Sequence, residues 1–149
     1  MPPSEFWPHL AQILEAAIEF REIAMREAHV KGLKVAAAYR PAGGASRSAH
    51  KWGKALDLDR IGGDGIAYYR CAVKFWSENA DKCQGGMGLG LYCAPGRVGG
   101  VRVHLDIGHQ TRTWQIHRGK SIRPHLVDRR KRSLARHLCR THDLKDPLS

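Results

Sequence analysis

The chain has 149 residues, a formal net charge of +11, and a hydrophobic content of 42%. A chain of this length can bury one core, so we expect a single folded domain and not a disordered protein. No run approaches the roughly 18 apolar residues that a membrane-spanning helix needs, and the N-terminal stretch MPPSEFWPHL lacks the pattern of a secretory signal. The positive charge favours an anionic partner such as nucleic acid, anionic lipid or a cell envelope.

The first expected element is a helix over residues 4–30, with Ser4 as its N-cap. This segment contains no glycine, and no proline after Pro8. Its apolar residues recur at helical spacing, which predicts one face packed on the core. They are Phe6, Leu10, Ile13, Leu14, Ala17, Ile18 and Ala24. Gly32 ends the helix, and residues 33–39 are predicted to form a strand.

The middle of the chain alternates between loop-forming and regular segments. Residues 40–53 are rich in Pro, Gly and Ser and are predicted to form a loop. A strand over 55–59, a helix over 66–80, and strands over 87–92 and 101–107 follow. This order predicts an α+β fold, in which a small, mainly antiparallel sheet carries helices packed on one face.

The hydrophobic pattern fades after Trp114, and basic residues dominate from Arg118 onward. We therefore predict a domain over residues 1–117 and a peripheral basic extension over residues 118–149. The cationic extension would hold the protein on an anionic cell envelope. We expect the protein to be a monomer.

Two of the predicted strands are apolar on one face and polar on the other, because side chains alternate along a strand. His104 and Asp106 share the polar face of one strand, and Asp57 and Asp59 share that of the other. Either strand alone is better interpreted as solvated surface of the sheet. Together with the nearby His50, they offer the imidazoles and carboxylates that zinc accepts. Three protein ligands would leave a fourth position open, as in catalytic zinc sites.

The segment SAHKWGKALD at residues 48–57 has the form SxHxxGxAxD. It resembles the signature of the zinc D-Ala-D-Ala peptidases, a family of peptidoglycan peptidases that includes carboxypeptidases, endopeptidases and phage endolysins. The family shares its fold with the hedgehog signalling domain. The resemblance implies that His50 and Asp57 bind zinc. Their spacing requires the chain to turn between them, and Gly53 is suited to that turn.

Two further segments resemble the same family. Residues 39–41, YRP, resemble a loop whose arginine meets substrate, which implies that Arg40 binds substrate. The stretches GLGLY at 88–92 and VHLDIG at 103–108 resemble the G-x-G-x-Y and V-H-x-D-x-G pattern of one subgroup. This part of the resemblance implies that His104 is the third zinc ligand.

One position departs from the family pattern. Many members carry a catalytic acid three residues before the last histidine ligand, where this chain has Val101. The nearest acid on the expected face is Asp106, which we expect to act as the general base. The alternative is that Asp106 binds the metal and His104 acts as a hydrogen-bond donor. Ser48 and Tyr92 are expected beside the substrate, with Ser48 making hydrogen bonds and not acting as a nucleophile.

These features predict a zinc metallopeptidase with one Zn²⁺ that hydrolyses stem peptides of bacterial peptidoglycan, as an endopeptidase or a D-Ala-D-Ala carboxypeptidase. With no secretory signal expected, we expect synthesis in the cytoplasm and action on the cell wall after release, as for a phage or prophage endolysin. One alternative is a non-catalytic zinc-binding module of the same fold. The other is a basic nucleic-acid-binding protein, although the chain has no recognition-helix, finger or RNP pattern.

Overall fold

A computed structural model describes residues 2–41, 48–93, 101–108, 111–117 and 120–122. Short 3₁₀ helices are labelled η. In chain order the elements are η1 (Ser4–Phe6), α1 (Trp7–Glu27), β1 (Gly32–Ala37), η2 (Ala49–Trp52), β2 (Ala55–Ile61), α2 (Gly65–Asn79), η3 (Ala80–Lys82), β3 (Met87–Cys93), β4 (Val101–Ile107), β5 (Arg112–His117) and β6 (Lys120–Ile122).

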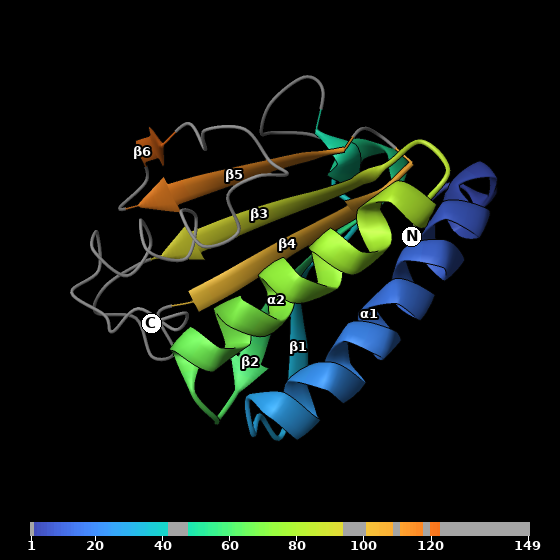
Figure 1. Cartoon of the computed structure of the whole chain (residues 1–149). Coiled ribbons are helices and arrows are strands. Elements are labelled where there is room, and N and C mark those ends of the chain that lie inside the picture. Colours follow the sequence, from blue (N-terminus) through green and yellow to red (C-terminus); the bar gives the residue numbers. More distant parts are fainter. Residues whose placement is uncertain (1, 42–47, 94–100, 109–110, 118–119, 123–149) are drawn as a thin grey trace.

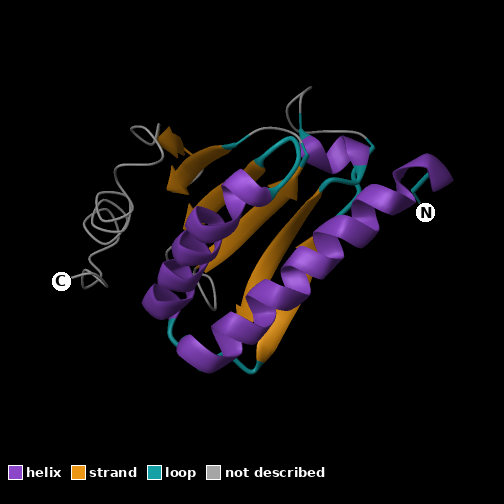
Figure 2. Ribbon diagram, turned by 45° about the vertical axis from the view of Figure 1, so that its right-hand side comes forward, coloured by secondary structure: helices purple, strands orange, loops and turns teal. Residues whose placement is uncertain are grey.

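The strands form one six-stranded sheet in the order β1-β2-β4-β3-β5-β6. Neighbouring strands are antiparallel except β3 and β5, which run parallel. Helices α1 and α2 lie side by side over one face of this sheet (Figures 1 and 2). The predicted α+β class, with a mainly antiparallel sheet and helices on one face, is confirmed for the described residues.

The core fills the space between the two helices and the sheet. Phe20 of α1 packs against two aromatic rings of α2, those of Tyr68 and Phe75, with centroids 5.6 Å apart in both pairs. The Tyr68 hydroxyl donates a hydrogen bond to the Leu58 carbonyl of β2, at 2.9 Å. This hydrogen bond ties the helix layer to the backbone of β2.

The core-facing stripe of α1 is narrower than expected. Leu14 and Ile18 are 44% and 59% exposed, whereas Phe20, which was not in the predicted stripe, is fully buried. A helix lying on one sheet buries a single narrow stripe of its surface. Here that stripe consists of Ile13, Ala17, Phe20 and Ala24. Ser4 does not cap the helix; it begins η1, and α1 follows with Pro8 in its first turn.

The remaining predicted elements agree with the structure within a few residues at each end, but η2, η3, β5 and β6 were not predicted. The predicted loop over 40–53 contains the short helix η2. The sheet also continues past His117, where we expected the domain to end, because β6 pairs with β5. Residues 123–149 of the expected basic extension lie outside the described residues. None of the helices in the described part has the length and apolarity that crossing a membrane requires.

Candidate metal centre

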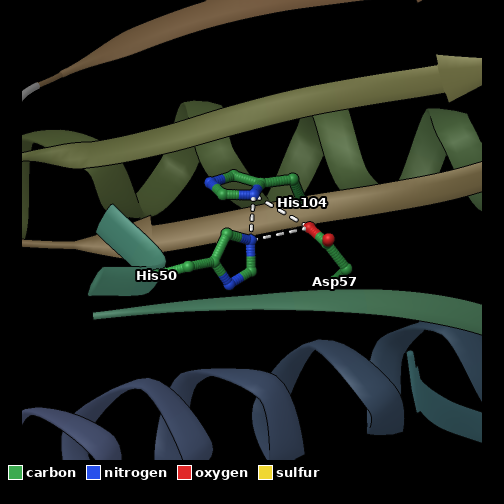
Figure 3. Close-up of side chains that lie close together, drawn as sticks. All are labelled: His50, Asp57 and His104. Atoms are coloured by element: carbon green, nitrogen blue, oxygen red, sulfur yellow. Dashed lines mark hydrogen bonds and ion pairs between the residues drawn. The ribbon is translucent and has the colours of Figure 1, made fainter. Parts of the chain in front are cut away.

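Three side chains from separate segments meet on the sheet face opposite the helices (Figure 3). His50 comes from η2, Asp57 from β2 and His104 from β4. The register of the two strands places Asp57 directly opposite His104. Because Leu56 and Leu58 point into the core, strand alternation turns Asp57 to the other face.

A left-handed turn brings His50 to the same place. Gly53, at φ 65°, ends η2, and its N–H donates to the His50 carbonyl at 3.4 Å. The Arg40 N–H donates to the same carbonyl at 3.0 Å, which ties the segment that follows β1 to η2. The turn predicted at Gly53 is therefore present, and it directs the chain from η2 into β2.

The three side chains are close enough to share one ion. His50 Nε2 lies 3.2 Å from Asp57 Oδ1 and 3.2 Å from His104 Nδ1, and His104 Nδ1 lies 2.9 Å from Asp57 Oδ1. A tetrahedral zinc ion with bonds of about 2.0–2.1 Å separates its ligand atoms by roughly 3.3 Å. All three residues are buried, and together they could hold a metal ion.

The outer nitrogen of each imidazole already has an acceptor. His50 Nδ1 lies 2.6 Å from the Ala38 carbonyl oxygen, and His104 Nε2 lies 2.9 Å from Asp106 Oδ2. Carbonyl and carboxylate oxygens only accept, so both outer nitrogens donate. In neutral rings the inner nitrogens then carry lone pairs, which converge with the Asp57 oxygen. Three acceptors at this spacing repel one another unless a cation or a proton lies between them.

Electrostatics favour positive charge at the same point. Burial alone would raise the pKa of Asp57, but hydrogen bonds from His104 and His50 outweigh it and hold that pKa below its ordinary value. Burial alone would lower the pKa of His104, but Asp106 and Asp57 outweigh it and raise that pKa above 6.5. The metal-free cluster thus favours a proton on His104, the position that a bound cation would take over.

The residues expected to bind substrate lie at different distances from the cluster. Arg40 is half-exposed, and its Nη2 lies 3.7 Å from Asp57 Oδ2, too far for a hydrogen bond. The Tyr92 ring centroid lies 6.4 Å from that of His104. Ser48 precedes η2, and its side chain makes no capping hydrogen bond there. The structure therefore places both Arg40 and Tyr92 beside the ligands.

Asp106 lies behind His104 and not among the three converging ligand atoms. It is fully buried, and its carboxylate contacts the outer nitrogen of His104, on the far side of the ring from the other ligands. Asp106 is thus not part of the His50, Asp57 and His104 group, and its expected role as the general base stays a prediction. Strand alternation identified the shared face correctly, but it does not specify on which side of a neighbouring ring a carboxylate lies. The Ala38 carbonyl was missed altogether, since no sequence pattern marks a backbone acceptor.

A scan against protein-family models, a search of curated proteins and a search of solved structures each found no match for this chain. No family is established by these comparisons. A proposal about function must therefore rest on the geometry of the cluster and on the sequence motif that surrounds it.

Proposed function

We propose that this protein is a zinc-dependent peptidase of bacterial peptidoglycan, with the fold shared by the zinc D-Ala-D-Ala peptidases and the hedgehog domain. The observation that carries the proposal is the convergence of three acceptor atoms, His50 Nε2, Asp57 Oδ1 and His104 Nδ1, within 3.2 Å of one another. Two of these residues belong to the SxHxxGxAxD motif. Two imidazoles and one carboxylate form a donor set typical of catalytic zinc, with a position left for water.

The chain prepares these ligands before any ion binds. When bound, zinc would lower the pKa of a water molecule and polarise a substrate carbonyl. His50 and His104 present their inner nitrogens because the Ala38 carbonyl and the Asp106 carboxylate bind the outer ones. Asp57 supplies negative charge, and its lowered pKa keeps it ionised at neutral pH. Little reorganisation is needed to form the centre.

The residues around the ligands suit a peptide that carries a carboxylate. Arg40 keeps about half of its side chain exposed while lying next to Asp57. A guanidinium in this position can bind a carboxylate of a stem peptide through two parallel hydrogen bonds. We assign the half-buried Tyr92 to the wall of the same substrate site, because its ring lies beside that of His104.

A zinc-binding module without hydrolysis is the second candidate function. The observation that favours it is the place of Asp106, whose carboxylate lies behind His104 and not among the ligand atoms. Asp106, which was expected to act as the general base, thus contacts His104 Nε2. Both candidates predict zinc binding, and they differ in what happens to the substrate.

Digestion of purified peptidoglycan separates the two candidates. The zinc-loaded protein should release fragments whose masses correspond to the addition of water across a peptide bond. A chelator should stop the release, and added zinc should restore it. Asp57→Ala should give no fragments because a ligand is lost. If the zinc-loaded protein leaves peptidoglycan of several crosslink types intact, the peptidase proposal fails and the binding module remains.

The same assay tests Arg40. A hydrogen-bonded charge contributes about 1.5–3 kcal/mol, so Arg40→Ala should lower kcat/KM by about 10–100-fold. The zinc content of this variant should not change, since Arg40 is not one of the three candidate ligands. Arg26→Ala is the matched control, because Arg26 is an exposed arginine on α1, which packs on the opposite face of the sheet. Equal activity of the two variants would remove Arg40 from the substrate site.

A further inference from the structure

A buried carboxylate lies directly behind one of the candidate ligands. Asp106 follows His104 by two residues on β4, so both side chains lie on the same face of the sheet. Asp106 is 0% exposed, and its Oδ2 lies 2.9 Å from His104 Nε2. A carboxylate taken out of water is costly unless it is hydrogen-bonded, so this contact strongly constrains both side chains.

The neighbouring strand leaves space for that carboxylate. In the register of β3 and β4, Gly88 pairs with Asp106. A Cβ atom at residue 88 would lie 2.6 Å from Asp106 Cγ, closer than real side chains approach. Gly88 does not have a positive φ, so glycine is required here for its small size and not for its backbone conformation. Any larger residue would displace Asp106 from its place behind His104.

The contact selects which nitrogen of His104 carries the lone pair. A neutral imidazole has its hydrogen on one nitrogen, and a carboxylate at Nε2 keeps it there. The lone pair is then on Nδ1, the atom that lies 2.9 Å from Asp57 Oδ1 and 3.2 Å from His50 Nε2. A ring turned over, or the other tautomer, would point a hydrogen at the other ligands. For His50 the Ala38 carbonyl makes the equivalent contact.

We propose that Asp106 is a positioning residue for the metal, and that Gly88 is the residue that makes room for it. The carboxylate holds the His104 ring so that Nδ1 faces the ion and increases the basicity of that nitrogen. The inference rests on the proposed metal centre, but it does not depend on hydrolysis.

Zinc affinity, measured by competition with a chromophoric chelator, tests the inference. Loss of such an outer partner typically costs 10–100-fold in metal affinity, and we expect a loss of about this size for Asp106→Ala and for Gly88→Ala. Asp106→Asn should lose less, because its amide oxygen can still accept from Nε2. Gly32→Ala is the matched control, since its Cβ would meet Ile61 Cδ1 at an ordinary 3.8 Å. Asp81→Asn controls for loss of an exposed carboxylate.

A second measurement reports on the ring itself. In nitrogen NMR of the zinc-loaded protein, His104 should show a hydrogen on Nε2 and none on Nδ1. Gly88→Ala, which changes neither partner chemically, should shift or broaden the Nε2–H signal, and Gly32→Ala should leave it unchanged. Far-UV circular dichroism shows whether each variant is folded, and Asp106→Asn serves if Asp106→Ala does not fold.

Three results would contradict the account in different ways. Wild-type affinity in both Gly88→Ala and Asp106→Ala would overturn the positioning role. Undiminished affinity in Asp106→Asn combined with lost hydrolysis would also overturn it, because Asp106 would then act on a proton and not on the ring. Failure of the wild-type protein to bind zinc would overturn the metal centre itself, on which the positioning role depends.

Discussion

At the scale of single residues, a proton and a metal ion compete for His104. Burial disfavours a charge on this ring, but hydrogen bonds to Asp106 and Asp57 outweigh that effect and raise its pKa above 6.5. A raised pKa stabilises the metal-free fold at low pH, and this stabilisation is lost as the pH rises through the raised value. Zinc binding has the opposite dependence, because it requires the unprotonated Nδ1.

We therefore predict that zinc affinity increases with pH in a range above pH 6.5. Below the pKa of His104 the slope of log affinity against pH should be positive, because binding of the ion displaces the proton on His104 Nδ1. Asp57 does not contribute to this slope because its pKa is lowered. Chelator competition at a series of pH values measures it, with His9→Ala as a control histidine variant. An affinity that stays constant above pH 6.5 would show that no proton is displaced at His104.

The three candidate ligands are also the part of the site that could best be predicted from the sequence. The SxHxxGxAxD motif and strand alternation brought His50, Asp57 and His104 together on one face, and the structure has them in contact. The role of Asp106 could not be predicted the same way. It depends on the orientation of one imidazole and on the space beside Gly88, both of which are tertiary features.

At the scale of elements, η2 determines where His50 lies. The helix ends at Gly53, which has a φ of 65°. A Cβ atom added at this residue would lie only 3.0 Å from Phe6 Cβ, so a side chain would be crowded as well as strained. The turn was predictable from the sequence, whereas η2 itself was not, because a single helical turn has too few residues to show a period. The three-residue strand β6 is likewise too short to show a period, and β5 lies where the hydrophobic pattern fades.

Gly53→Ala should therefore weaken both the fold and the metal centre. A non-glycine residue in the left-handed region costs about 1–2 kcal/mol, which corresponds to a fall in Tm of roughly 2–8 °C for a protein of this size. Zinc affinity should fall as well, because His50 lies in the helix that this turn ends. Thermal unfolding with and without zinc measures both effects, and Gly32→Ala again provides a glycine variant with room for its Cβ. An unchanged Tm would mean that the turn adapts and does not determine the position of η2.

At the scale of the whole molecule, the two faces of the sheet have different roles: one packs on the helices and the other carries the candidate ligands. Helices α1 and α2 cover one face and bury its leucines under their own aromatic residues, and the ligands lie on the other face (Figures 1 and 3). The two faces follow from the alternation of apolar and polar residues in β2 and β4. The fold class itself was predicted from the order of helices and strands along the chain. The narrow stripe of α1 could not, because it depends on how the helix is rotated about its axis against the sheet.

The central claim is that His50, Asp57 and His104 hold one zinc ion, and metal content measures this most directly. After reconstitution with zinc and removal of the excess, mass spectrometry should find about one zinc per chain in the wild type and in His9→Ala. His50→Ala, Asp57→Ala and His104→Ala should each retain almost none. A wild-type protein without bound zinc, or full zinc content in any of these three variants, would contradict the claim.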